Sequence, residues 1–386
     1  MQALHLWARG CPLAPTWWKA WVGKDAPFGP VWVPVYCCHG WRQHCPGLPP
    51  GPVQLRQLLH QEPLIAVLFQ IRHALHYTYE RPVLLEPTTL RLIPRRDPAQ
   101  QLVHHKLLVP QLNSSSHVLE ADGGEAVILR FDGLHQELNI EAEMVVCTTR
   151  ANPFDWVVTH QAALLLPAAY PHAVARSLLG CRQGMAPVND AVHRWAAELA
   201  AEVDGSTTSF LMHLADTIHH GFHHVGRPEG EPMTPADTLA SRTGACRDTA
   251  MLYVAACRSL GLAARFVSGY SMHHPEEVSE HELHAWAEVY LPGAGWRGYD
   301  PSLGLAVADG HVVLTAAPDH HLAAAVSGSY RGTGVGSSLR YAVEVRTAPT
   351  LEELQALNHH QPLQLPPQEQ WISGAVTAAE MEDERR

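Results

Sequence analysis

The spacing of apolar residues changes near residue 150 of this chain, from a period of two to a period near 3.6. In residues 137–144 every second residue is apolar and its neighbours are polar, which is the pattern of a half-buried antiparallel strand. Similar runs, separated by turn sequences such as ADGG at 121–124, recur between residues 66 and 150. Several short strands at this spacing predict a small β-sandwich.

Helical periodicity follows in residues 188–203 and 206–222. Thr234, with a proline directly after it and an acid three residues on, predicts the start of another helix that ends near Gly244. A further helix is expected from Cys246 to Gly261. Three strand candidates come next, at 264–270, 284–292 and 296–302. We therefore expect an α+β fold: a β-sandwich followed by a core in which a cysteine-bearing helix packs on an antiparallel sheet.

These patterns divide the chain into four parts. Residues 1–65 contain six of the eleven tryptophans, many prolines and no sustained period, so we expect a poorly ordered N-terminal extension. Residues 66–150 are expected to form the sandwich and 151–345 the core. Residues 346–386 are expected to be a polar tail with one or two helical turns near Thr350.

Charge and composition exclude some classes of protein. The net charge of -11 disfavours a general nucleic-acid binder, which needs a basic face. No apolar run reaches the roughly 18 residues that span a bilayer, and the N-terminus does not resemble a secretory signal. The eight cysteines are not spaced as a disulfide framework. A cytoplasmic protein without a membrane or nucleic-acid partner is the expectation.

Two sequence features raise the possibility of a metal site. The string CCHGWRQHC at 37–45 has no spaced second pair of ligands, which argues against zinc. Paired histidines recur along the chain, at 104–105, 219–220, 223–224, 273–274, 320–321 and 359–360. No HExxH motif occurs, because His281 and His284 are three residues apart, and no calcium loop of the DxNxDG kind is present. We expect neither a metal nor a cofactor.

Cys246 is the candidate nucleophile. It follows the small residues of Thr243-Gly244-Ala245 and begins a helical pattern, so its sulfur lies at a helix N-terminus, where unpaired N–H groups stabilise a thiolate. Cys257 lies eleven residues on, about 16 Å along the helix axis, in the apolar string AACRSL. We interpret Cys257 as a core residue and Cys246 as the reactive thiol.

His284 and Asp300 are the candidate partners of Cys246. His284 begins one predicted strand, Asp300 ends the next, and a short PGAG turn joins them. An antiparallel hairpin would place the two side chains opposite each other or nearly so, with Cβ atoms roughly 5–8 Å apart. An aspartate there would orient the imidazole, whose other nitrogen would face the sulfur. His281, three residues before His284, is an alternative candidate for the histidine. Each of Cys246, His284 and Asp300 taken alone is more often structural than catalytic.

Two longer strings carry a family resemblance. GACRDTAMLYVAACRSLGLAARFVSGY and HAWAEVYLPGAGWRGYDPSLGL resemble the motifs of bacterial transglutaminase-like proteins: Gly-x-Cys before a helix, Ala-Arg-x-Val-x-Gly, His-Ala-Trp-x-Glu-Val and Gly-Trp-x-x-x-Asp-Pro. The string HYTYERPVLLEPTTLRLIPR resembles the N-terminal β domain that accompanies this core. The resemblance covers about residues 66–345. It implies a papain-like, transglutaminase-like core with Cys246, His284 and Asp300 as the catalytic triad.

The chemistry implied is cysteine-dependent acyl transfer on a protein or peptide substrate through a thioester. If water accepts the acyl group the enzyme is a protease or amidase, and if an amine accepts it the enzyme is a transglutaminase. The alternative is a non-catalytic binding module with the same fold. The backbone N–H of Cys246 is the expected first oxyanion donor. The sequence leaves open the second donor, the natural substrate, the acyl acceptor, the oligomeric state and the role of residues 1–65.

Overall fold

The computed structural model describes residues 66–184, 187–226, 231–273, 283–356, 363 and 365, together with two short strands, β1 (Trp17–Ala20) and β2 (Val31–Pro34). β1 and β2 pair antiparallel. The rest of the N-terminal extension, the string at 37–45, His281 and most of the expected tail lie outside the described residues. No helix within the described part of the chain has the length and apolar character needed to cross a membrane.

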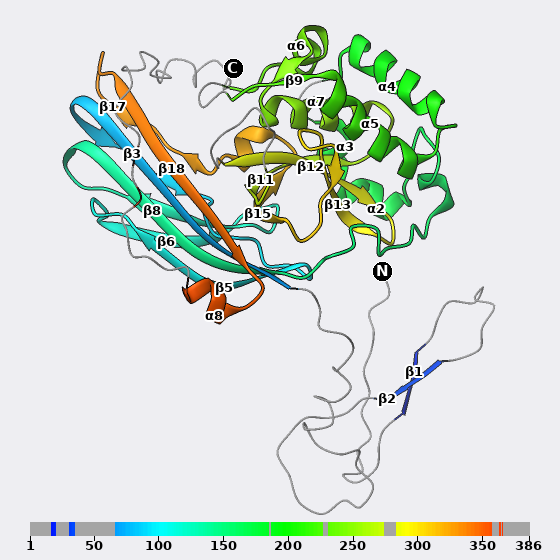
Figure 1. Ribbon diagram of the computed structural model, residues 1–386, viewed down its shortest axis with the longest axis horizontal. Helices are drawn as coiled ribbons and strands as arrows, with labels where there is room; N and C mark the ends of the chain where they lie inside the picture. The colour runs from blue at the N-terminus through cyan, green and yellow to red at the C-terminus, as the bar shows by residue number, and fades with distance from the viewer. Residues whose placement is uncertain are drawn as a thin grey trace, which may run out of the picture. The chain divides into compact units, whose positions relative to one another are not determined.

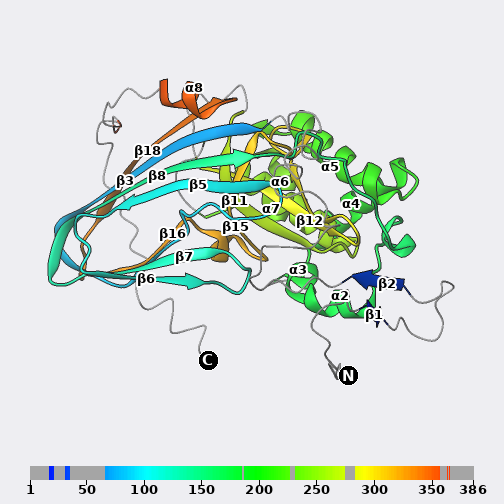
Figure 2. The same cartoon turned by 90° about the horizontal axis from the view of Figure 1, so that it is seen from below.

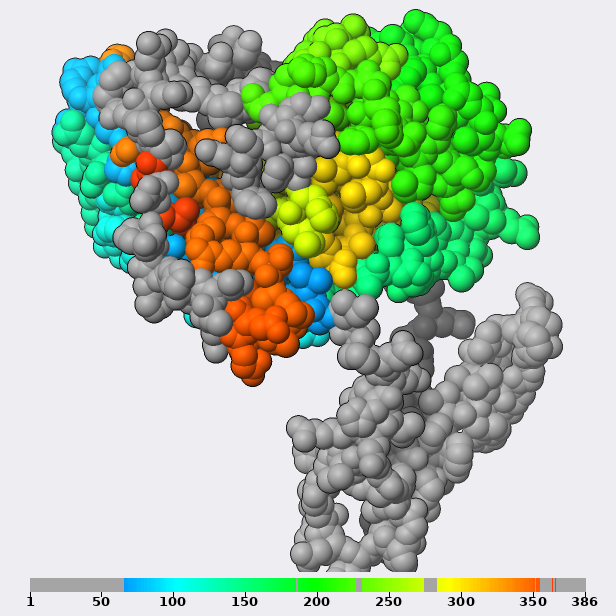
Figure 3. Space-filling view, in the orientation of Figure 1, coloured from blue at the N-terminus to red at the C-terminus, as the bar shows by residue number. Residues whose placement is uncertain are grey.

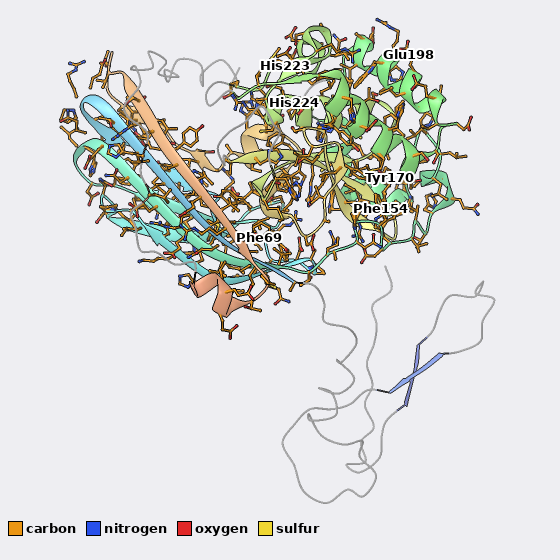
Figure 4. All side chains as sticks on the ribbon, in the orientation of Figure 1. Phe69, Phe154, Tyr170, Glu198, His223 and His224 are labelled. Atoms are coloured by element: carbon orange, nitrogen blue, oxygen red, sulfur yellow. The ribbon has the colours of Figure 1, made fainter. Side chains whose placement is uncertain are left out.

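The expected N-terminal β-sandwich is present, and Figure 2 shows its two layers. One layer contains the strands β17 (Tyr330–Arg331), β3 (Val67–Leu85), β8 (Leu134–Thr148), β5 (Gln100–Leu108) and also β18 (Ser337–Ala348), which pairs with β3. The other contains β16 (Val326–Ser327), β4 (Thr88–Leu90), β7 (Glu125–Arg130) and β6 (Ser114–Leu119). All these pairings are antiparallel. Period-two alternation buries one face of β8, and Phe69 of β3 is one of the fully buried residues (Figure 4).

Three strands from the C-terminal part of the chain belong to this sandwich, which corrects the expected boundary at 345/346. That boundary falls within β18, whose twelve residues pair with β3 from Leu68 to Tyr79. Figure 1 shows β18 lying along β3 over most of its length. The reason is the backbone of β3: without β18, this long strand would leave a row of N–H and C=O groups unpaired.

The core combines helices with one antiparallel sheet. Its main helices are α4 (Asp190–Glu202), α5 (Thr207–Gly221), α6 (Pro235–Ser241) and α7 (Cys246–Ser259). The sheet order is β14 (Leu305–Ala306), β13 (Gly295–Asp300), β12 (His284–Leu291), β11 (Ala264–Ser271) and β15 (His311–Ala317). Shorter elements are η1 (Gln161–Ala163), α2 (His172–Ser177), α3 (Leu179–Gln183), β9 (His223–His224), β10 (Thr243–Gly244), η2 (His320–Ala323) and α8 (Leu351–Ala356).

The helices begin where capping residues occur. The side chains of Asn189, Ser206 and Thr234 each accept a hydrogen bond from a backbone N–H in the first turn of α4, α5 and α6. α6 ends at Ser241, earlier than expected, because Arg242 adopts a left-handed conformation with φ of 54°. The α+β fold class and the main core helices are therefore confirmed, whereas β15 was not predicted.

The sandwich and the core sheet share an apolar cluster. Tyr270 of β11 and Val312 and Leu314 of β15 pack with the buried residues of the sandwich. The Tyr270 hydroxyl lies 2.8 Å from Nδ1 of His73, a buried residue of β3. On the other side of the core sheet, α4, α5 and α7 form a separate cluster with Tyr299. The core sheet is thus covered by helices on one side and by the sandwich on the other.

Candidate active site

Cys246 is the first residue of α7 and is partly exposed. The first N–H groups of a helix have no intrahelical acceptor, so the Cys246 amide is free of a partner within α7. Cys246 and His284 both line one cavity of about 390 Å³. The sulfur is therefore accessible to a substrate at the position where the helix dipole favours negative charge.

Asp248 holds the start of this helix in place. Its carboxylate is fully buried and accepts hydrogen bonds from the backbone N–H of Ala245 at 2.8 Å and of Met233 at 2.8 Å. A Cβ at Gly244 would lie 2.8 Å from Asp248 Cβ, so this position requires glycine. Sequence reasoning missed Asp248, although an acid in the first turn is the same pattern that identified the helix after Thr234.

His284 and Asp300 meet across the β12–β13 hairpin. Ala287 pairs with Tyr299, so His284 and Asp300 are offset diagonally by two residues rather than directly opposed. His284 Nε2 lies 2.6 Å from Asp300 Oδ2. The other ring nitrogen, Nδ1, is left for Cys246, whose hydrogen bond with His284 helps to raise the pKa of the histidine. The structure brings the three predicted residues together in the order thiol, imidazole, carboxylate.

Asp300 has four hydrogen-bond donors around a fully buried carboxylate. Oδ2 accepts from His284 and also from His311 Nε2 at 3.0 Å. Oδ1 accepts from the backbone N–H groups of Ser302 at 3.0 Å and Leu303 at 3.2 Å. The turn after β13 therefore fixes one carboxylate oxygen, and two histidines share the other.

The pKa shifts follow from this arrangement. Burial opposes ionisation of both partners, but the mutual charge and hydrogen bond of His284 and Asp300 outweigh it. The pKa of His284 is raised well above its usual 6.5, and the pKa of Asp300 is held far below its usual 3.8. Burial lowers the pKa of His311, which is therefore neutral at neutral pH and donates its Nε2–H to Asp300. The site holds an imidazolium–carboxylate pair at neutral pH.

His311 is the site residue that sequence reasoning did not find. It begins β15, eleven residues beyond Asp300, and is fully enclosed. One histidine among 27 carries no distinguishing mark, and β15 itself was not predicted. The position of Trp286 beside the histidines can be inferred from the sequence. Trp286 lies two residues after His284, and residues two apart on a strand share a face.

Trp286 covers the histidines from one side, as its position two residues after His284 predicts. Its ring is fully buried, with its centroid 6.0 Å from that of His284 and 5.1 Å from that of His311. A Cβ at Gly269 would lie 2.6 Å from the indole, so only glycine fits beneath it. The indole excludes water from the charged pair, which strengthens the interaction.

Cys257 lies away from this site, whereas one possible metal-binding group borders the same cavity. Cys257 is fully buried in the helical cluster, and burial raises the pKa of its thiol far above the usual value. Its assignment as a core residue is confirmed. Among the described residues, two groups have donor atoms within 4.8 Å of one another and could offer ligands to a metal: one is His284, Asp300 and His311, and the other is Glu231, His320 and His321. Glu231 and His320 already hydrogen-bond at 3.0 Å.

Comparison with known proteins supports the fold and the family. Residues 194–301 match the model of the transglutaminase-like superfamily, and residues 69–147 match that of the bacterial transglutaminase-like N-terminal region. An uncharacterized protein of Mycobacterium leprae is 25% identical over 302 residues, which cover 72% of this chain and 97% of that protein. An uncharacterized protein of Mycobacterium tuberculosis is 25% identical over 267 residues, 65% of this chain and 84% of the relative.

A crystal structure from Cytophaga hutchinsonii, named provisionally as a cysteine protease, superposes with a TM-score of 0.58 at 20% identity. The superposition covers 77% of this chain and 93% of that one. Fold and site together define an α+β protein with a helix-start cysteine facing a histidine–aspartate pair on neighbouring strands. Residues 194–301 thus form a transglutaminase-like core, and residues 69–147 correspond to the bacterial transglutaminase-like N-terminal region.

Proposed function

We propose that this protein is a cysteine-dependent acyl-transfer enzyme that acts on carboxamide or peptide bonds of a protein or peptide. Cys246 is the nucleophile, His284 the acid–base and Asp300 the residue that orients the histidine. The observation that carries the proposal is the line from the Cys246 sulfur through the His284 ring to the buried Asp300 carboxylate, 2.6 Å from Nε2.

In the first half-reaction the Cys246 thiolate attacks the carbonyl carbon and forms a tetrahedral oxyanion. The amide N–H of Cys246, unpaired within α7, is the proposed donor to that oxyanion. The C–N bond then breaks, and the His284 imidazolium gives its proton to the leaving ammonia or amine. A thioester on Cys246 remains, and His284 is neutral.

In the second half-reaction water or a primary amine attacks the thioester. His284 takes the proton of the attacking group, the C–S bond breaks, and the thiolate–imidazolium pair is restored. The carboxylate of Asp300 also accepts hydrogen bonds from His311 and from the amides of Ser302 and Leu303, so it remains ionised while His284 is neutral. Water gives an amidase or protease, and an amine gives a transglutaminase.

Mass spectrometry of the protein with a glutamine-containing peptide, with and without a primary amine, tests the proposal. Deamidation, amine incorporation and backbone cleavage give different mass changes, and Cys246→Ala should abolish whichever occurs. Iodoacetamide labelling provides an independent readout: Cys246 should react fastest among the thiols and lose that advantage in His284→Ala. Uniform slow labelling and no mass change would instead indicate a binding module with this fold.

A further inference from the structure

The cavity at Cys246 is built by two domains. On the core side it is lined by Cys246, His284 and the apolar residues Phe266, Leu283 and Ala285. Opposite them it is lined by residues of the sandwich strands β3, β16 and β18. In Figure 3 the orange surface of β18 lies beside the yellow surface of the core sheet region. The N-terminal domain therefore contributes a wall to the space in which a substrate would bind.

This sandwich wall is one continuous patch. His73, Leu75 and Tyr77 alternate along β3 and so point to the same face of the sheet. On the neighbouring strand, Leu339 pairs with Tyr77 and Tyr341 with Leu75, which places their side chains on that face too. The patch is formed by these five residues and is called the sandwich wall below.

The sandwich wall carries no charge at neutral pH. Burial lowers the pKa of His73 to about 4, so its imidazole is neutral, and its Nδ1 is engaged with the Tyr270 hydroxyl at 2.8 Å. Burial raises the pKa of Tyr77 to about 12, so this phenol is neutral as well. The charged side chains that line the cavity, Glu231, Arg247 and the protonated His284, come from the core. A charged substrate group placed against the sandwich wall would lose water without gaining an ionic partner there.

We propose that the sandwich wall is a specificity subsite that takes a large apolar or aromatic side chain of the substrate, on the acyl side of the carbonyl attacked by Cys246. This proposal rests on the acyl-transfer function proposed above. A cavity of about 390 Å³ accommodates a phenylalanine or leucine side chain beside the peptide backbone. Burying such a side chain corresponds to about a ten- to hundred-fold gain in reaction rate over alanine.

The test uses the full-length chain and dipeptidyl chloromethyl ketones that alkylate Cys246, with Ala, Phe or Glu at each of the two positions before the ketone. We expect a Phe probe to react about ten- to hundred-fold faster than the Ala-Ala probe, and the Glu probes no faster than Ala-Ala. Iodoacetamide, which has no side chain, reports on the thiolate alone. Equal rates for all dipeptidyl probes, or a preference for Glu, would overturn the subsite.

Substitutions locate the subsite. Leu75→Trp and, independently, Leu339→Trp should fill the cavity, reduce the Phe-to-Ala rate ratio to near one and leave the iodoacetamide rate unchanged. Leu84→Trp is the matched control, because Leu84 lies on the same strand β3, is 43% exposed and does not line the cavity. A Phe preference that survives both filling substitutions in folded protein would place the subsite elsewhere.

The two proposals fail in different ways. If iodoacetamide labels Cys246 fast and this depends on His284, but the dipeptidyl probes show no side-chain selectivity, only the subsite proposal is wrong. Slow labelling of Cys246 by every reagent would remove the acyl-transfer function itself.

Discussion

Two buried carboxylates on neighbouring strands have different basic partners, and the partner decides whether the pair can take part in proton transfer. Glu288 on β12 is paired with two arginines. The carboxylate accepts hydrogen bonds from Arg95 Nη2 at 2.8 Å and Nη1 at 3.1 Å, and from Arg265 Nε at 2.8 Å. Asp300 on β13 is paired with two histidines, His284 and His311. Both acids are almost completely buried, and both have pKa values below the usual range.

The difference lies in the partners. Arginine does not release its proton in a protein, so the charges around Glu288 are fixed. Arg95 belongs to the sandwich and Glu288 to the core sheet, so this cluster fastens one domain to the other. Histidine can release its proton near neutral pH, so the charge beside Asp300 can change during a reaction. The comparison teaches that the same buried ion-pair geometry serves stability in one place and proton transfer in the other.

The largest expected effect comes from Asp300→Asn. An asparagine still accepts from the Ser302 amide, but it no longer stabilises the imidazolium and favours the wrong tautomer of His284. Turnover in the peptide assay should fall by about 10⁴-fold. Melting of the variant by circular dichroism should show a folded protein, and retained turnover would remove the distinction between the two carboxylates.

The pH dependence of turnover also tests the pairing of His284 with Asp300. Because the pKa of His284 is raised well above 6.5, its proton is present at neutral pH and is lost only as the pH rises through that higher value. Activity should therefore decline on an alkaline limb above pH 6.5. In Asp300→Asn the raising charge is gone while burial remains, so the limb of the residual activity should move to lower pH. An unmoved limb would argue against Asp300 as the partner of His284.

The converse substitution, Glu288→Gln, should affect stability instead of chemistry. It leaves the buried guanidinium group of Arg265 without its carboxylate and that of Arg95 with Asp97 alone, which costs about 3–5 kcal/mol in the free energy of unfolding. Urea unfolding measures this loss. The partly exposed pair of Glu344 and Arg72, 3.5 Å apart, provides the control, and Glu344→Gln should cost less than about 1 kcal/mol. Per folded molecule, Glu288→Gln should retain wild-type turnover.

The two carboxylates also differ in how far the sequence predicts them. His284 and Asp300 are joined by one tight hairpin, so a local register argument was enough to pair them. Glu288 is conspicuous as an acid within an apolar strand, but its partner Arg95 is 193 residues away, and no pattern along the chain connects them. His311 and the sandwich wall depend on β15 and β18, whose pairing with distant strands is decided by tertiary packing.

The acid stability of the Glu288 cluster gives a fourth test. Its two arginine partners lower the pKa of Glu288 from 4.5 to about 2. A depressed carboxyl pKa contributes stability that is present above the unfolded value and is lost as the pH falls through the folded one. The difference between these two pKa values corresponds to about 3 kcal/mol. Urea unfolding between pH 5 and pH 3 should show wild-type stability falling more steeply than that of Glu288→Gln, and parallel curves would contradict the assignment.

His311 gives the smallest effect and the finest test, because it is a positioning residue that acts through Asp300. Removing a hydrogen bond to a charged group costs about 1.5–3 kcal/mol, so His311→Leu should lower turnover about ten- to hundred-fold. In His311→Gln the side-chain amide can reach the position of Nε2 and donate to Oδ2, and turnover should recover most of that loss. A merely structural role would move melting temperature and turnover together in both variants. Equal turnover in the two variants would mean that Asp300 is oriented by the Ser302 and Leu303 amides without help from its second histidine.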